Sequence, residues 1–324
     1  MQGNLTSVEL CAGAGGQALG VEQAGFSHQA CVEIDDWCRK TLNLNRKQWN
    51  VLEGTQCDLT QFDARPFAGV DLVAGGVPCP PFSKAGKQLG AADERDLFPD
   101  ALRVVDEVRP KAVMLENVRG FLDAVFHDYR QQLKSQLKAM GYTFAEWHLY
   151  NASDFGVSQL RPRVVIVAVH DNYADKFEWP KGIDMRPLSV GECLHDLMGA
   201  NGWPGVDAWA AQADEIAPTI VGGSKKHGGP DLGPTRAKRA WASLGVNGKT
   251  IAEEAPGPDF NEDMPRLTVR MVARLQGFPD DWEFAGRKTA SYRQVGNAFP
   301  PPVARAVAQN LKAAITARRL YAVA

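Results

Sequence analysis

The first half of the chain alternates short apolar runs with stretches that favour helix, and this alternation restricts the folds open to it. We expect strands at 6–11, 29–33, 71–74, 112–116, 143–149 and 163–169. Helices are expected at 17–24, 37–45, 97–108 and 121–140, the last with an apolar face that runs from Leu122 to Met140. The pattern is typical of a doubly wound α/β fold, in which helices cover both faces of a parallel sheet.

The composition and the hydrophobic pattern of the sequence change after Met185. Residues 186–265 are rich in Gly, Pro and Trp, and their strand and helix periods are weak. Regular helix is expected again at 268–277 and 303–320. We therefore predict a main domain at 1–185, a smaller loop-rich domain at 186–284, and a C-terminal segment at 285–324 that returns to the main domain.

Composition excludes several classes of protein. The chain has 324 residues, of which 44% are hydrophobic and 23% charged, and its net charge is −2, so a nucleic-acid site would need local clusters of basic residues. No signal peptide is evident, and the longest apolar run, 164–169, is too short to span a membrane. The six cysteines form no CxxC pair, which indicates a reducing cytoplasm and argues against a metal site.

A glycine-rich loop, AGAGG at 12–16, lies between the first expected strand and helix. Glycines at 13, 15 and 16 would let the backbone turn tightly and approach a ligand. Glu33 ends the next strand, where an acid commonly binds ribose hydroxyls, and Asp58 could accept from an adenine amino group. The residues alone leave open a tight turn without a ligand and a nicotinamide or flavin site.

Cys79 lies in PCPPFS at 78–83, directly after an expected strand. The flanking prolines stiffen the backbone, which favours a thiol whose position matters. A cysteine thiol has a pKa near 8.5 and needs a positive or dipolar environment to act as a nucleophile. The basic, glycine-punctuated segment 84–90 is typical of a mobile lid. The alternative is that Cys79 is a small apolar residue in a turn.

Three charged residues lie at the ends of later strands. Glu116 ends an apolar run, where a carboxylate is costly unless it is paired or functional, and a salt bridge to Arg119 or Arg163 is the structural alternative. Arg161 and Arg163 are two residues apart, hence on one side of an extended chain. They could form a fork of donors for a carbonyl or phosphate, or simply a pair of surface charges.

In this order, the motifs resemble those of DNA cytosine-5 methyltransferases of the bacterial modification type. The matching segments are ELCAGAGG at 9–16, PCPPFS at 78–83, ENV at 116–118, QLRPR at 159–163, RLT at 266–268 with RLQGFP at 274–279, and QVGNAFPP at 294–301. The resemblance implies a Rossmann-like S-adenosylmethionine-dependent methyltransferase fold with a target-recognition domain at 186–284. The implied activity is methyl transfer to carbon 5 of a flipped-out cytosine in a specific duplex sequence, within a restriction-modification system.

The resemblance also implies roles for single residues. Cys79 would add to carbon 6 of the cytosine, Glu116 would engage ring nitrogen 3 and the amine, and Arg163 with Arg161 would bind the base carbonyl. S-adenosylmethionine, which leaves as S-adenosylhomocysteine, would lie among Cys11, Gly13, Gly15, Gly16, Glu33, Ile34, Asp58, Leu59, Pro78, Leu97 and Asn297. The family usually has an aromatic residue at position 11 and often another at position 34, so cofactor affinity is in doubt there.

DNA contacts are expected from the lid and from a basic segment at 219–241. The candidates are Ser83, Lys84, Gln88, Lys225, Lys226, Arg236, Lys238 and Arg239, although a solvated basic loop is the alternative. We expect a monomer that acts on duplex DNA in the bacterial cytoplasm, on the nucleoid, with a cognate endonuclease that shares its site without direct contact. The rival functions are a tRNA cytosine-5 methyltransferase and a catalytically silent DNA-binding protein. A dehydrogenase would leave the Pro-Cys-Pro motif unexplained.

Overall fold

The computed structural model describes residues 5–78, 96–223 and 229–317. Its centre is a six-stranded sheet of order β2-β1-β3-β4-β6-β5. The strands are β1 (Leu5–Leu10), β2 (Phe26–Val32), β3 (Leu72–Gly75), β4 (Ala112–Val118), β5 (Phe144–Asn151) and β6 (Pro162–Val169). All six strands expected from the sequence are present, and the α/β fold class is confirmed.

The sheet is mixed, so the expectation of a parallel sheet is wrong at one end. β1 to β4 pair in parallel, whereas β6 runs antiparallel to both β4 and β5. Only residues 152–161 join β5 to β6, which is too short for the crossover that a parallel pair needs. The antiparallel register places Val118 opposite Arg163 and Glu116 opposite Val165, which brings two functional candidates to the same edge.

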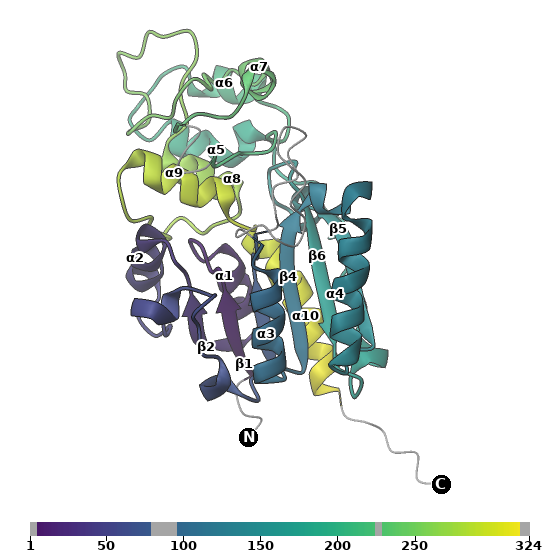
Figure 1. The fold of residues 1–324 in the computed structure, drawn as a ribbon. Helices are drawn as coiled ribbons and strands as arrows, with labels where there is room; N and C mark the ends of the chain where they lie inside the picture. Colours follow the sequence, from purple (N-terminus) through teal and green to yellow (C-terminus); the bar gives the residue numbers. More distant parts are fainter. Residues whose placement is uncertain (1–4, 79–95, 224–228, 318–324) are drawn as a thin grey trace.

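Helices cover both faces of the sheet (Figure 1). α3 (Phe98–Val108) and α4 (His127–Ala139) pack on one face, and α1 (Gly16–Gln23) and α10 (Pro301–Thr316) pack on the other. α4 starts later than predicted because two short 3-10 turns, Arg119–Leu122 and Ala124–Phe126, precede it. α10 contacts α1 along its length, so the end of the chain returns to the sheet that its beginning forms.

The smaller loop-rich domain predicted at 186–284, called the second module below, contains helices that the sequence did not predict. α5 (Val190–Met198), α6 (Val206–Gln212) and α7 (Thr235–Ser243) all lie within 186–265, where the sequence shows only weak helix and strand periods. Each has only about two turns, too few for a clear hydrophobic period. The signal that could have revealed α5 is its capping box, in which Ser189 and Glu192 exchange hydrogen bonds.

The core of this module extends into the first domain. Trp209 and Trp241 are buried together with residues of α8 (Val269–Leu275), α9 (Lys288–Asn297), α1 and α2 (Asp36–Asn45). The QLRPR segment ties the two parts together through hydrogen bonds. Leu160 N–H donates to the Ala217 carbonyl at 2.8 Å, and Ile220 N–H donates to Gln159 Oε1 at 2.9 Å. This motif therefore holds the second module against the sheet.

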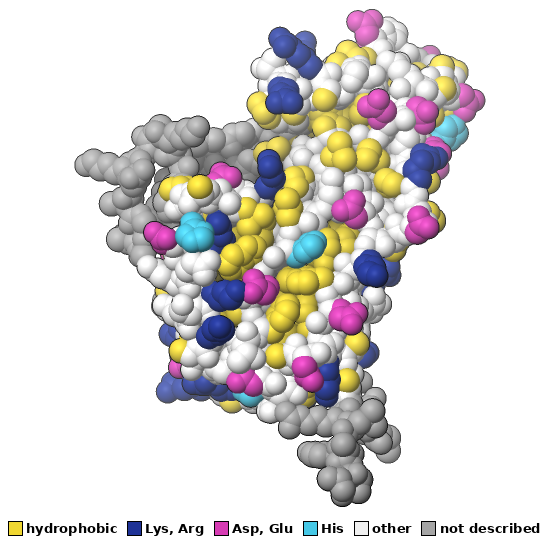
Figure 2. All heavy atoms as spheres, turned by 90° about the vertical axis from the view of Figure 1, so that its right-hand side faces the viewer, with side chains coloured by type: hydrophobic (Ala, Val, Ile, Leu, Met, Phe, Trp, Pro, Cys, Tyr) yellow, Lys and Arg dark blue, Asp and Glu magenta, His cyan; other side chains and the backbone are white. Residues whose placement is uncertain are grey.

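The face beside the edge strand β5 carries a band of hydrophobic side chains with charged side chains on either side (Figure 2). Trp147 of β5 lies under the guanidinium of Arg130, 5.6 Å from the ring centroid, and next to Lys134. These cations cover part of the apolar surface that an edge strand would otherwise expose. Among the described residues, no helix has both the length and the apolarity needed to cross a membrane.

Candidate active site

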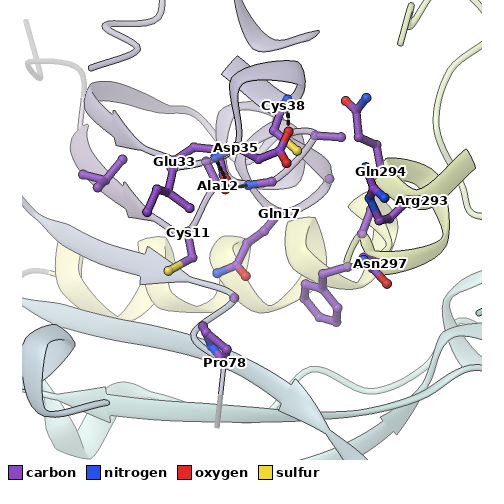
Figure 3. Close-up of a pocket in the computed structure, with 18 of the residues that line it drawn as sticks. Cys11, Ala12, Gln17, Glu33, Asp35, Cys38, Pro78, Arg293, Gln294 and Asn297 are labelled. Atoms are coloured by element: carbon purple, nitrogen blue, oxygen red, sulfur yellow. Dashed lines mark hydrogen bonds between the residues drawn. The ribbon is translucent and has the colours of Figure 1, made fainter. Parts of the chain in front are cut away.

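A cavity of about 470 Å³ opens where the carboxyl ends of β1, β2, β3 and β4 meet α9 (Figure 3). Nearly all the residues predicted for the cofactor lie in its wall. These are Cys11, Gly13, Gly16, Glu33, Ile34, Asp58, Leu59, Pro78, Leu97 and Asn297. Glu116, predicted for catalysis, lines the same cavity. A ligand bound here would therefore contact segments that are nearly 300 residues apart in sequence.

The glycines of the first loop serve two purposes. Gly13, with φ +54°, has open space where a side chain would project, so its backbone faces the cavity. Gly15 does not line the cavity; with φ +87°, a Cβ there would lie 2.8 Å from Leu42 and 2.9 Å from Trp282. A Cβ on Gly16 would overlap the carbonyl oxygen of Phe299. Gly15 and Gly16 are thus required for packing of the second module and the C-terminal segment against the loop.

Cys11 also has a left-handed backbone, with φ 50°. Such a conformation is uncommon outside glycine and costs free energy, and it recurs at ligand-binding turns. Burial raises the pKa of its thiol, and the nearby carboxylates of Glu33 and Glu9 raise it further. Cys11 is therefore a neutral, apolar part of the cavity wall and has no nucleophilic character.

Glu33 is held rigidly at the end of β2. Its Oε2 accepts from Gly13 N–H at 2.7 Å and its Oε1 accepts from Asp35 N–H at 2.6 Å. Burial raises the pKa of Glu33, and these two hydrogen bonds oppose the rise. Asp35 in turn caps α2 by accepting from Trp37 N–H and Cys38 N–H. The helix cap thus fixes the loop that presents Glu33.

Asp58 lies on another wall of the cavity. Partial burial raises its pKa, but hydrogen bonds from Thr60 and Gln61 outweigh this effect and leave the pKa below its usual value. Asp58 is therefore an ionised acceptor. Ile34, also in the wall, is 67% exposed, so the position where the family often has an aromatic residue is open to solvent.

Glu116 and Arg163 form an ion pair at the floor of the cavity. Arg163 Nε donates to Glu116 Oε1 at 2.8 Å, and only 13% and 12% of the two side chains are exposed. Burial raises the pKa of Glu116, although Arg163 and Arg161 oppose the rise. The salt bridge considered as a structural alternative thus exists, and its carboxylate also faces the cavity.

Arg161 and Arg163 do not form the expected fork. Arg161 is fully buried; its Nη1 donates to the Ile220 carbonyl at 2.7 Å and its Nη2 to the carbonyls of Gly296 and Ala298. β6 begins at Pro162, so the alternation of an extended strand does not apply to residue 161. Arg161 joins the second module to the C-terminal segment, while Arg163 pairs with Glu116, which lines the cavity.

Sequence reasoning missed several residues of the cavity wall. They include Gln17, Cys57, Gly76, Gly223, Arg293, Gln294 and Phe299. Arg293 precedes the QVGNAFPP segment, and Gln294 and Phe299 lie within it. Asn297 donates to the Gly223 carbonyl at 3.2 Å, so the second module also reaches the cavity.

Cys79, Ser83, Lys84, Gln88, Lys225 and Lys226 lie outside the described residues. Pro78, the neighbour of Cys79 in sequence, lines the cavity. The remaining DNA candidates belong to α7, in the upper part of Figure 1. Arg236 and Arg239 are exposed there, whereas Lys238 is half-buried and pairs with Asp231 at 3.3 Å. Arg236 and Arg239 therefore present the basic surface of this helix.

Glu9 is a buried acid behind the loop. It is fully buried, and neither carboxylate oxygen has a hydrogen-bond partner within the described residues; Gln17 Oε1 likewise lacks a donor. Burial raises the pKa of Glu9 well above its usual value. At low pH, Glu9 is therefore neutral in the folded protein. As pH rises, the unfolded chain loses this proton more easily than the folded protein does, so the free energy of unfolding decreases.

We expect Glu9→Gln to stabilise the protein at pH 8 by roughly 1–3 kcal/mol, because it removes this cost while keeping a similar shape. The gain should shrink as pH falls toward 5, where an unfolded glutamate also begins to take up a proton. Thermal denaturation across this pH range measures it, with the exposed Glu53→Gln as the control. A stability difference that does not change with pH would contradict the assignment.

Comparisons with known proteins show the family of the chain. The profile of the family "C-5 cytosine-specific DNA methylase" matches residues 5–313. The Type II methyltransferase M.NaeI of Lentzea aerocolonigenes is 56% identical over 314 residues, which cover 96% of this chain and 76% of that protein. The Type II methyltransferase M.NgoMIV of Neisseria gonorrhoeae is 53% identical over 309 residues, covering 94% and 96%.

A solved structure supports the fold. The crystal structure of an E. coli prophage protein assigned as a DNA modification methyltransferase superposes with a TM-score of 0.67 at 22% identity, and covers 97% of this chain and 100% of that one. The family match spans the motifs at 9–16, 116–118, 159–163 and 294–301. Residues of the first, second and fourth motifs line the cavity, and Arg161 of the third donates to the carbonyl of Ile220. The chain therefore belongs to the C-5 cytosine-specific DNA methylase family and is a DNA cytosine-5 methyltransferase.

Proposed function

We infer that the chain methylates carbon 5 of a cytosine that it extrudes from a specific duplex DNA sequence, as the modification enzyme of a restriction-modification system. The observation that carries this inference is the buried Glu116–Arg163 pair, whose carboxylate opens into the large cavity beside Pro78. A buried acid with a raised pKa next to a guanidinium suits recognition of a base that has both donors and acceptors.

The cavity fits S-adenosylmethionine. Its volume of about 470 Å³ is in the range of small-molecule sites. We propose that Glu33 binds the ribose hydroxyls, Asp58 the adenine amine, and Gly13 and Asn297 the methionine part. When bound, S-adenosylmethionine supplies an electrophilic methyl group on a sulfonium. Cys11, Gly16, Ile34, Leu59, Pro78 and Leu97 complete the wall, and Gly15 supports the loop from behind.

The protein's residues then activate the base. Cys79, as thiolate, adds to carbon 6 of the cytosine and makes carbon 5 electron-rich enough to take up the methyl group. Loss of the proton from carbon 5 then breaks the bond between carbon 6 and sulfur and releases Cys79. Glu116 donates its proton toward ring nitrogen 3 and accepts from the exocyclic amine, which offsets charge as it develops. Arg163 holds Glu116 in place and offers its remaining N–H groups to the base carbonyl. Arg161 acts as a positioning residue, because its terminal nitrogens are bonded to backbone carbonyls.

The second module is proposed to bind the DNA. Arg236 and Arg239 on α7, with Lys225, Lys226, Ser83, Lys84 and Gln88, would contact phosphates or bases, and Lys238 would support them. M.NaeI and M.NgoMIV are both named Type II methyltransferases, which supports a modification role alongside an endonuclease. We propose that the chain acts as a monomer in the bacterial cytoplasm, a reducing compartment that the free cysteines of the described segments fit.

We expect the double variant Arg236→Gln/Arg239→Gln to weaken duplex binding and to lower the slope of log K against log salt by up to about 2, because each phosphate contact contributes about 0.9. Fluorescence anisotropy at several salt concentrations measures the slope. Lys238→Gln is the matched control from the same helix and should have a smaller effect, since Asp231 already neutralises Lys238. An unchanged slope in the double variant would exclude α7 from the DNA surface.

Methylome sequencing tests the proposed function. A methylation-free bacterial host that expresses the chain should acquire 5-methylcytosine at one short sequence, and a culture expressing M.NgoMIV provides the positive control. Absence of modified cytosine in every sequence context, with the protein folded and present, would contradict the proposal. Methylation confined to RNA would replace the DNA substrate with the RNA alternative.

A further inference from the structure

Within the described residues, one basic side chain lines the cofactor cavity and has no hydrogen-bond or ion-pair partner. Among the described residues that line it, Arg293 is the only Lys, Arg or His, whereas Glu33, Asp35, Asp58 and Glu116 are all acids. Within the described part of the chain, the Arg293 guanidinium has no hydrogen bond or ion pair. Two cations that contact lining residues already have acidic partners: Arg163 pairs with Glu116, and Arg39 pairs with Asp36. A lone guanidinium in an acidic cavity suggests an anionic group on the ligand.

The position of Arg293 supports this view. It lies on α9 one turn before Asn297, so both side chains project from one face of the helix, and Ala290 and Gln294 from the same helix also line the cavity. Figure 3 shows Arg293, Gln294 and Asn297 on the α9 side, across the cavity from Glu33. Arg293 therefore marks the end of the cavity opposite the acid that we assign to the ribose.

We propose that Arg293 binds the carboxylate of the methionine part of S-adenosylmethionine and of its product; this rests on the proposed function. At neutral pH this cofactor carries two positive groups, the sulfonium and the ammonium, and one carboxylate. The net negative charge of the described cavity wall favours a ligand that carries positive groups, and Arg293 is the matching cation for the carboxylate. A guanidinium can bind a carboxylate through two parallel hydrogen bonds, which gives both affinity and orientation.

This assignment makes Arg293 a specificity residue. Ligands that keep the adenosine, the sulfur and the amine but lack the carboxylate would keep every contact with Glu33 and Asp58. They would leave the Arg293 guanidinium without its ionic partner, and a charged hydrogen-bond partner contributes far more to discrimination than a methylene.

Isothermal titration calorimetry without DNA tests the proposal on the full chain. The two ligands are S-adenosylhomocysteine and its decarboxylated analogue, S-adenosyl-3-thiopropylamine. We expect wild-type protein to bind the analogue about 10–100-fold more weakly. Arg293→Gln should bind S-adenosylhomocysteine with a similar loss and should distinguish the two ligands by less than about 3-fold. Arg293→Lys should fall between the two, since it keeps the charge and loses the fork.

The outcomes separate this proposal from the proposed function. Arg270→Gln, an exposed arginine on neighbouring α8, is the control and should match wild type. If Arg293→Gln discriminates between the ligands as strongly as wild type does, the assignment is wrong. Unchanged ligand binding with a lower salt slope for duplex DNA would mean that Arg293 contacts a phosphate instead. Failure of folded wild-type protein to bind S-adenosylhomocysteine at all would contradict the proposed function itself.

Discussion

Cys79→Ala is expected to abolish methyl transfer, lowering turnover by at least about 10⁴-fold, because no other group would activate carbon 5. Binding of S-adenosylhomocysteine should survive, since the residues assigned to the cofactor are unchanged. Transfer of radiolabelled methyl groups to duplex DNA measures the first effect, and calorimetry measures the second.

Cys193→Ala is the matched control for this variant. Cys193 is a buried cysteine of α5 in the second module, away from the residues that line the cavity. Its replacement should leave turnover within a few fold of wild type, which shows that loss of a thiol alone does not inactivate the enzyme. Near-normal turnover by Cys79→Ala would refute its role as the nucleophile.

Glu116→Gln should reduce turnover by about 10²–10⁴-fold, the range typical of a lost proton donor. Burial raises the pKa of Glu116 above its ordinary value, which makes the protonated form accessible at higher pH than for an exposed glutamate, whereas an amide cannot transfer a proton to ring nitrogen 3. In wild type, the methyl-transfer rate should fall as pH rises through the pKa of Glu116. The remaining methyl-transfer rate of Glu116→Gln should show no such fall. Single-turnover rates from pH 5 to 9 provide the measurement.

The melting temperature of Glu116→Gln must be measured together with its turnover, because Arg163 would lie beside a neutral partner. Glutamine can still accept from Arg163, so we expect the protein to fold with a lower melting temperature. Glu146→Gln, which removes the carboxylate of an ion pair to Lys134 on the edge strand, is the control and should keep full turnover. Equal loss of activity in both variants would show that Glu116 acts through stability alone.

Sequence reasoning predicted the sheet and much of the cavity, because their signals are local. The six strands are short apolar runs. Gly13 and Gly16 lie in the turn that leads from β1 into α1, Glu33 directly follows β2, and Glu116 lies two residues before the end of β4. Since strand ends on one edge of a sheet converge, a residue at a strand end can be assigned to the site without knowledge of the tertiary contacts.

The roles of residues that act through tertiary packing could not be predicted from local sequence signals. Nothing in the sequence near Arg161 shows that its guanidinium binds carbonyls of Ile220, Gly296 and Ala298, which lie at least 59 positions away. The reversed direction of β6 and the three short helices of the second module were missed for related reasons. Arg293 was missed because its significance depends on the acids that other segments contribute to the cavity, among whose described lining residues it is the one cation.

Covalent capture tests the chemistry most directly. The protein should be incubated with S-adenosylmethionine and a duplex that contains 5-fluorocytosine at the methylated position, since fluorine at carbon 5 cannot leave as a proton does. Mass spectrometry of the digested adduct should find the modified base bonded to the sulfur of Cys79. A cross-link to Cys11, Cys57 or another residue, or no cross-link from protein that methylates the unfluorinated duplex, would contradict the account.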